Sequence, residues 1–136
     1  MSRVQRRLAR IGDRPHNRSR GRLGEEVAIE ILREEGYEIV ERNFQVQGGE
    51  LDVVARERGA LCFVEIKVRS GDEFGTALQA VDGRKRGRMI RAAEHFLHRN
   101  ELDEPICRFD VLGIDQTEEG WEVTLIRDAF TIDGLF

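Results

Sequence analysis

The segment FVEIKVRS, residues 63–70, places a carboxylate and an ammonium two positions apart inside an apolar run. Side chains alternate between the two faces of a β-strand, so Glu65 and Lys67 would share one face and the aliphatic residues the other. Glu and Lys are among the residue types least often buried. A strand with both on one face therefore indicates either a solvated surface or a site where further charges meet.

A second acidic segment, GELDVVARE at residues 49–57, comes just before it and is joined to it by a turn of hairpin length. Glu50 and Asp52 share a face in the expected alternation, so hairpin pairing would bring Asp52 beside Glu65 and Lys67. Two carboxylates ~4 Å apart near a protein surface repel by roughly 4 kcal/mol at an effective dielectric near 20. A divalent cation offsets this repulsion best, and Mg²⁺ takes oxygen ligands. The alternative is an ordinary Glu65–Lys67 ion pair on an exposed sheet.

A third acid, Glu25, lies on an expected helix that begins near Ser19 or Leu23 and ends near Gly36. The apolar stripe of this helix consists of Leu23, Val27, Ala28, Ile31 and Leu32. At 100° per residue Glu25 falls inside the apolar arc, whereas most other acids of the helix point to solvent. We expect Glu25 to point toward the core or its rim, where it could approach the same acids.

The remaining pattern predicts an α/β fold with the order α-β-β-β-α-β-β. The expected elements after the first helix are strands at 37–44, 49–57 and 61–69, a helix at 82–100, and strands at 106–114 and 121–130. The helix between the third and fourth strands favours a parallel crossover. The sheet should therefore be mixed and flanked by helices.

Length and composition favour one domain, with 136 residues, 40% apolar and 35% charged. No apolar run approaches the ~20 residues of a membrane span, so no membrane partner is expected. The N-terminus lacks the apolar segment of a secretory signal, which favours a cytoplasmic protein. Cys62 and Cys107 fall in strand-like runs and are expected to be reduced core thiols.

The net charge of −4 hides a gradient along the chain. Residues 1–22 carry eight arginines and one acid, whereas residues 101–136 carry ten acids and two arginines. We interpret residues 1–20 as a flexible basic arm and residues 21–136 as the folded domain. The mean acidity does not exclude a nucleic-acid partner, because the field at one end can be strongly positive.

Four basic residues are candidate phosphate contacts: Arg22, Arg69, Lys85 and Arg88. Arg22 adjoins the basic arm, and Arg69 continues the charged face one step beyond Lys67. Lys85 and Arg88 lie in the first turns of the second expected helix, where free N–H groups also favour phosphate. A solvated basic surface is the alternative for each. Lys67 and Lys85 are the only lysines among the 22 basic residues.

The pattern Asp52, Glu65 and Lys67, with an acid on the preceding helix, resembles the PD-(D/E)xK nuclease superfamily. Several longer blocks resemble the YraN-type family of small bacterial proteins, which is regarded as similar to archaeal Holliday junction resolvases. These blocks are GRLGEEVAIEILREEGYEIVERNF, GGELDVVARERGALCFVEIKVRSGDEFG, AVDGRKRGRMIRAAEHFL and RFDVLGID. They cover about residues 21–115.

The resemblance implies a restriction-endonuclease-like core over residues 21–136 and a Mg²⁺- or Mn²⁺-dependent endonuclease acting on DNA, including branched DNA. Asp52 and Glu65 would bind the metal, and Glu25 would help to hold it. Lys67 would act on the attacking water. The chain has Leu51 where the superfamily's named motif has proline. Symmetrical cleavage of a junction needs two sites, which implies a homodimer.

Two non-catalytic alternatives stay open from the sequence. The first is a nucleic-acid-binding module that keeps the nuclease fold, because the superfamily includes inactive members. The second is a protein-interaction domain whose acidic C-terminal third contacts a basic partner.

Overall fold

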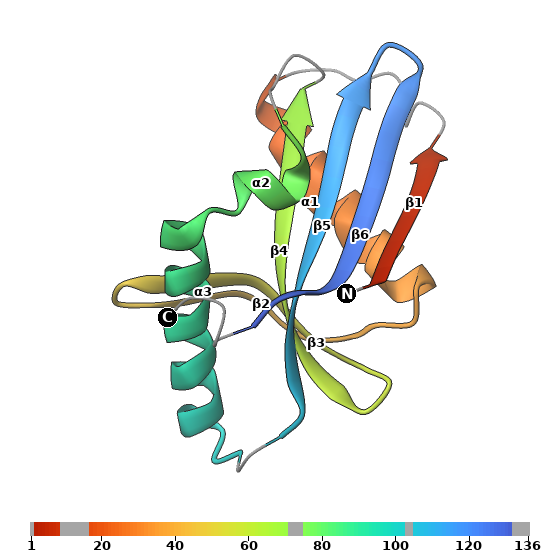
Figure 1. Cartoon of the computed structure of the whole chain (residues 1–136). Helices are drawn as coiled ribbons and strands as arrows, with labels where there is room; N and C mark the ends of the chain where they lie inside the picture. The colour runs from red at the N-terminus through yellow and green to blue at the C-terminus, as the bar shows by residue number, and fades with distance from the viewer. Residues whose placement is uncertain (1, 9–16, 71–74, 103–104, 132–136) are drawn as a thin grey trace.

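The computed structural model of the chain describes residues 2–8, 17–70, 75–102 and 105–131, with side chains described from residue 24 onward. Its elements (Figure 1) are β1 (Ser2–Leu8), α1 (Asn17–Glu34), β2 (Glu38–Val46), β3 (Gly49–Glu57), β4 (Ala60–Ser70), α2 (Ala77–Ala80), α3 (Gly83–Arg99), β5 (Cys107–Thr117) and β6 (Gly120–Phe130).

The strands form one six-stranded sheet in the order β1-β6-β5-β4-β3-β2. Neighbouring strands are antiparallel except β4 and β5, which pair in parallel from Leu61↔Cys107 to Ser70↔Gln116. The connection between these two contains α3, so the predicted parallel crossover is confirmed. The predicted α/β class, with a mixed sheet flanked by helices, is also confirmed and is consistent with a restriction-endonuclease-like core.

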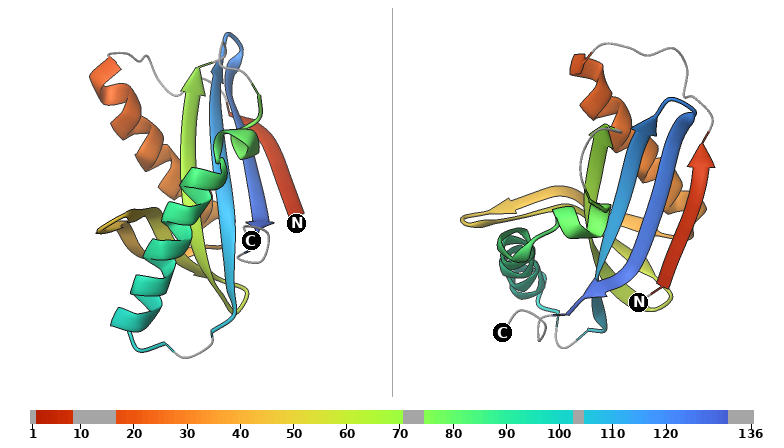
Figure 2. Two further views of the ribbon diagram at one scale, coloured as in Figure 1. Left: turned by 60° about the vertical axis from the view of Figure 1, so that its left-hand side comes forward. Right: turned by 45° about the horizontal axis from the view of Figure 1, so that its top comes forward.

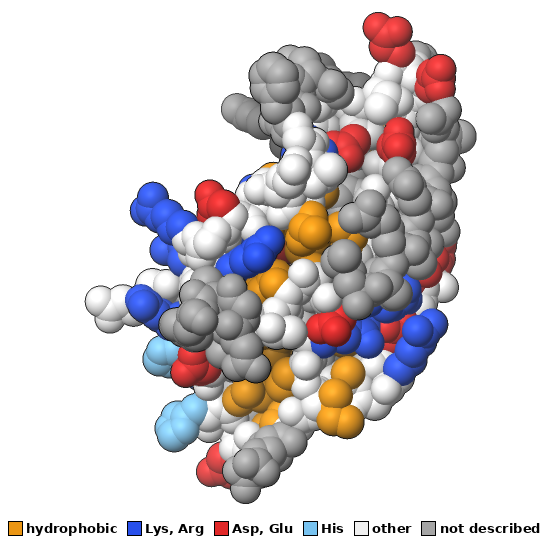
Figure 3. Space-filling model, viewed as in Figure 1, with side chains coloured by type: hydrophobic (Ala, Val, Ile, Leu, Met, Phe, Trp, Pro, Cys, Tyr) orange, Lys and Arg blue, Asp and Glu red, His pale blue; other side chains and the backbone are white. Residues whose placement is uncertain are grey.

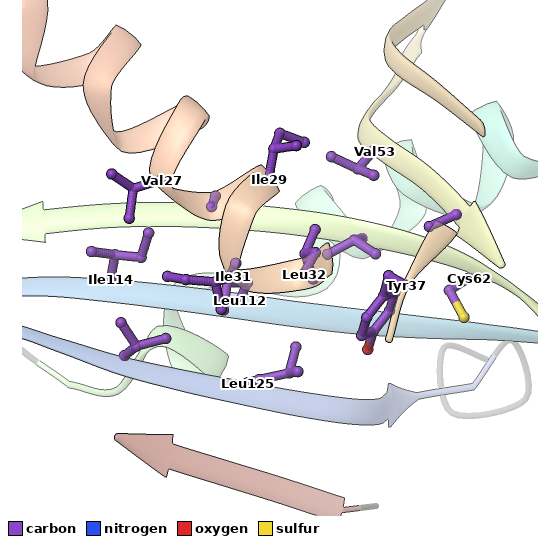
Figure 4. Packing of buried hydrophobic residues seen from close by; sticks show 14 of the residues in the cluster. Val27, Ile29, Ile31, Leu32, Tyr37, Val53, Cys62, Leu112, Ile114 and Leu125 are labelled. Atoms are coloured by element: carbon purple, nitrogen blue, oxygen red, sulfur yellow. The ribbon is translucent and has the colours of Figure 1, made fainter. Parts of the chain in front are cut away.

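Two apolar layers cover the two faces of the sheet. On one face α1 buries Ala28, Ile31 and Leu32 against residues such as Val64 and Leu112 (Figure 4). On the other face α3 packs its apolar side against β3 and β4, with Phe96 edge-on to the ring of Phe63, the ring centroids 6.1 Å apart. Figure 2 shows the two helices from two further directions. No helix in the described ranges is long and apolar enough to cross a membrane.

The N-terminal region differs from the expected flexible arm. Ser2–Leu8 forms an edge strand that pairs antiparallel with β6, from Ser2↔Arg127 to Leu8↔Trp121, and α1 begins at Asn17. This strand lacks a regular apolar pattern, because an edge strand can pair through its backbone alone. Residues 9–16, also part of the predicted arm, lie outside the described residues.

A charged network is buried within the fold, away from the predicted site residues. Arg127 donates two hydrogen bonds to Glu57, at 2.8 Å and 2.7 Å, and Arg108 donates to Glu57 and to Asp110. The Tyr37 hydroxyl donates to Asp110 Oδ2 at 2.6 Å. Glu35 adds a third acid, its Oε1 lying 3.7 Å from an Arg127 nitrogen, so two arginines hold three acids together. Burial opposes the ionised form of Glu57, but the two guanidiniums more than offset this and hold its pKa below the usual value.

We expect Glu57→Ala to lower the free energy of unfolding by about 3–5 kcal/mol, because it leaves two buried guanidiniums without their shared acid. Urea unfolding followed by circular dichroism measures the change. The matched control is Glu94→Ala on the exposed face of α3, which should stay within about 0.5 kcal/mol of the original chain. A Glu57→Ala protein as stable as this control would show that the network contributes little.

Candidate functional site

The candidate site lies where β3 and β4 separate. Their pairing runs from Glu57↔Ala60 to Val53↔Val64 and does not continue to Asp52. Beyond this point the Ile66 N–H of β4 donates its hydrogen bond to Asp52 Oδ2, at 2.8 Å, in place of a main-chain carbonyl of β3. Asp52 is thereby held in the gap between the two strands.

The strand geometry around Asp52 departs from the expected alternation. Val53 belongs to the core layer on the α1 face, whereas Leu51 belongs to the layer on the α3 face together with Val54. Strict alternation along residues 49–57 would put Leu51 and Val53 on one face, so this expectation was wrong at Asp52. In β2, Asn43 between Arg42↔Val53 and Phe44↔Leu51 has a left-handed φ of 53°, while the register of the two strands is the same on both sides of it.

Glu65 is the most unusual group of the site. Its side chain is 3% exposed, and its Oε1 atom has no hydrogen-bond partner among the described residues. Its Oε2 lies 3.4 Å from Lys85 Nζ. Burial, followed by the neighbouring charge and hydrogen bond of Asp52, raises the pKa of Glu65 to about 8. Asp52 is thus close enough to Glu65 to act on its carboxyl, and their joint role as metal ligands stays a prediction.

Lys85 connects α3 to these acids. Its ammonium lies 2.7 Å from Glu50 Oε1 as well as 3.4 Å from Glu65 Oε2. The hydrogen bond from Lys85 lowers the pKa of Glu50, with smaller contributions from Arg88 and Lys67. The close approach of α3 depends on Gly49, because a Cβ there would lie 2.6 Å from the Arg88 carbonyl oxygen.

Lys67 is half-buried, two residues beyond Glu65 on the same strand. Strand alternation places it on the α3 face with Glu65, and its charge contributes to the lowered pKa of Glu50. Within the described part of the chain it forms no ion pair and no hydrogen bond with another side chain. Lys85 is paired with Glu50 and Glu65, whereas the Lys67 ammonium is not paired with any described acid.

Glu25 approaches Asp52 from the α1 face. Its side chain is exposed like those of Glu26 and Glu30, so, contrary to the expectation, its exposure does not distinguish it from the other acids of α1. A pocket beside Asp52 is lined by Glu25, Ile29, Arg42, Asn43, Asp52, Val53, Ile66 and Val68. Glu65 and Lys67 do not line this pocket. Asp52 thus lies between Glu25 on one side and the Glu50–Glu65–Lys85 group on the other.

The residues present fit a cation in part. In the described ranges no three His, Cys, Asp or Glu side chains are gathered closely enough to form a complete metal site. Asp52 and Glu65 nevertheless place two carboxylates together, and the buried oxygen of Glu65 lacks a partner. Buried polar atoms are nearly always paired in native proteins, so an unpaired carboxylate oxygen is the feature that a hard cation would satisfy.

The four predicted phosphate contacts have different surroundings. Arg69 donates to Asp115 Oδ1 at 2.8 Å, and its side chain is 9% exposed. Lys85 is engaged with Glu50 and Glu65, a contact that sequence reasoning missed because it depends on how α3 packs. Arg88 is half-buried on α3, and the Arg22 side chain lies outside those described. Phosphate binding by all four stays a prediction.

The raised pKa of Glu65 predicts how stability depends on pH in metal-free protein. The folded state favours the neutral carboxyl, so this contribution is complete below the ordinary pKa of 4.5 and is lost as pH rises through about 8. Relative to Glu65→Gln, the free energy of unfolding of the original chain should fall by roughly 3–5 kcal/mol over this range.

Urea unfolding in EDTA at pH 5 to 9 measures the difference between the two proteins. The control Glu30→Gln, on the exposed face of α1, should parallel the original chain. A constant difference between the original chain and Glu65→Gln would contradict the prediction.

Comparison with known proteins identifies the family of the chain. Residues 24–114 match the model of "Uncharacterised protein family UPF0102". A UPF0102 protein of Moorella thermoacetica is 41% identical over 115 residues, covering 83% of this chain and 96% of its own length. One of Ralstonia pickettii is 42% identical over 123 residues, covering 88% of this chain and 95% of its own length. The chain therefore belongs to the UPF0102 family, as the sequence blocks indicated.

Proposed function

We propose that this protein is a metal-dependent endonuclease that hydrolyses phosphodiester bonds in DNA. The observation that supports it most is the Glu65 carboxylate, which is buried beside Asp52 with one oxygen unpaired. Such a group costs free energy in its ionised form unless a cation joins it, and without a cation it is relieved by taking up a proton. Two carboxylates with an uncommitted ammonium two residues away are the groups that phosphodiester hydrolysis needs.

Asp52 and Glu65 would hold a Mg²⁺ or Mn²⁺ ion, with Glu25 approaching from the α1 face through the shared pocket. A bound divalent ion would polarise a phosphoryl oxygen and lower the pKa of a water molecule. Lys67 would orient the attacking water and stabilise the negative charge that develops on the phosphoryl oxygens. The Asp52 contact with Ile66 N–H fixes the carboxylate before substrate arrives, which limits the reorganisation needed.

Lys85 has a supporting part in this proposal. It neutralises Glu50 and faces Glu65, so the acids can stay close together before a cation or phosphate is present. The choice of branched DNA as substrate and the homodimer rest on the family resemblance. A cytoplasmic location belongs to the same proposal.

We expect Lys67→Ala to lower the cleavage rate by about 100-fold or more, because an electrostatic contact to the transition state is lost. The assay uses duplex, single-stranded, flap and four-way-junction DNA, with Mg²⁺, Mn²⁺ or EDTA. Circular dichroism and binding in EDTA should be unchanged. Arg33→Ala, which removes an exposed cation from α1, serves as the control. Full-rate cleavage by Lys67→Ala would remove the role assigned to Lys67.

The second candidate is a nucleic-acid-binding module without catalysis. It is favoured by the Lys85 ammonium, which already neutralises part of the acidic group, and by the lack of a complete three-ligand metal site among the described residues. The same panel of DNA distinguishes the two. Salt-dependent binding without metal-dependent turnover on any substrate would support this candidate and contradict the nuclease.

Metal binding can be tested without cleavage. A ligand that binds only the folded state at 100 times its dissociation constant stabilises it by about 2.7 kcal/mol. We therefore expect Mn²⁺ at pH 8 to raise the melting temperature of the original chain, but not that of Asp52→Asn or Glu65→Gln. Glu30→Gln should respond like the original chain. An equal response in all four proteins would place the bound ion elsewhere.

A further inference from the structure

One face of α3 carries basic side chains along its whole length. They recur at the helical spacing and lie within an arc of about 100° when viewed down the axis. We call this set the basic stripe; it consists of Arg84, Arg88, Arg91, His95, His98 and Arg99. Arg88 is half-buried and the others are exposed. The opposite side of the helix buries Met89, Ala93 and Phe96.

The charge of the basic stripe is not neutralised within the described part of the chain. Arg84, Arg88 and Arg91 form no ion pair there, and Glu94 is the single acid in the sequence of α3. Solvated helices usually intersperse charges of both signs, which form pairs three or four residues apart. The stripe therefore presents unpaired positive charge, as expected for a surface that meets a polyanion.

The basic stripe is continuous with the candidate site. Arg88 lies close enough to Glu50 to lower the pKa of that carboxyl, after the larger effect of Lys85. Farther along, the Arg99 guanidinium lies 5.0 Å from the centre of the Phe44 ring of β2. From Arg84 to Arg99 the helix rises about 22 Å, which corresponds to about six nucleotides at an axial spacing of 3.4 Å.

The part of α1 whose side chains are described has the opposite charge. On the described part of α1, residues 24–34, the exposed side chains are Glu25, Glu26, Glu30, Arg33 and Glu34. A polyanion would be repelled from this part of α1 and attracted to α3. In Figure 3 blue and pale-blue side chains lie along the left edge with a few red ones among them, a second blue group lies at the right, and red side chains gather at the upper end of the molecule.

We propose that the basic stripe of α3 is the docking surface for one strand of a nucleic acid, and that it leads this strand to Glu65 and Lys67. The assignment of the polyanion as DNA rests on the proposed function. Arginine guanidiniums bind phosphate oxygens with two parallel hydrogen bonds, which suits a regularly spaced backbone. The substrate would therefore approach the acids from the α3 face, while Glu25 stays on the side away from the strand.

The test compares two double variants that remove the same charge. Arg84→Gln/Arg91→Gln removes two exposed stripe arginines and spares Arg88, which adjoins Glu50. Arg33→Gln/Arg58→Gln removes two exposed arginines from α1 and from the β3–β4 turn. Fluorescence anisotropy with labelled duplex and four-way-junction DNA is measured in EDTA between 50 and 200 mM salt, so that cleavage cannot contribute. Circular dichroism confirms that both variants are folded.

We expect the stripe variant to bind about tenfold more weakly at 100 mM salt, and its plot of log K against log salt to be shallower by about two. The affinity of the control variant should change less than twofold.

Equal losses of affinity in both variants, or no DNA binding by the original chain, would overturn the docking surface. Loss only in the stripe variant, without metal-dependent cleavage by the original chain, would support the surface and reject the nuclease. The same anisotropy assay with a labelled Glu-rich peptide tests an acidic protein as the partner. Loss of affinity for this peptide but not for DNA in the stripe variant would show that the surface binds an acidic protein instead.

Discussion

The electrostatic cost of burying Glu65 beside Asp52 is the constraint on which the site depends. The fold could have avoided this cost with an apolar residue, because the position continues a buried strand between Val64 and Ile66. Instead the carboxyl is enclosed by α3, with Lys85 as its partial counter-charge and one oxygen without a partner. The separation of β3 from β4 beyond Val53 and the close packing of α3 on Gly49 bring these groups together.

The two faces of the sheet have different relations to this site. On the α1 face Glu25 shares a pocket with Asp52, whereas on the α3 face Glu65 meets Lys85 and Glu50. Asp52 contacts the groups on both faces, because its side chain lies between β3 and β4, where it accepts the hydrogen bond of the Ile66 N–H. This arrangement lets a single carboxylate connect groups contributed by helices on opposite faces.

Much of this arrangement follows from the sequence, because it depends on local periodicity. The order of the main elements and the parallel crossover follow from apolar periodicity. The strict alternation failed between Leu51 and Val53, which lie in different core layers, and no pattern in the sequence of β3 reveals this. Strand β1 was missed because its pairing depends on the backbone of β6. The engagement of Lys85 required the packing of α3 against β3, which is a tertiary contact that periodicity does not encode.

The parallel pairing of β4 with β5 also determines when the site can be completed. Asp52 and Glu65 lie on a local hairpin, but Leu61 finds its partner Cys107 only after 46 further residues have been made and α3 has packed. Closing such a long loop is slow compared with forming a hairpin. On a growing chain Glu65 would therefore remain hydrated and ionised at little cost. Lys85 would reach these acids only once α3 has packed, so partly synthesised chains would hold the carboxylates without this counter-charge.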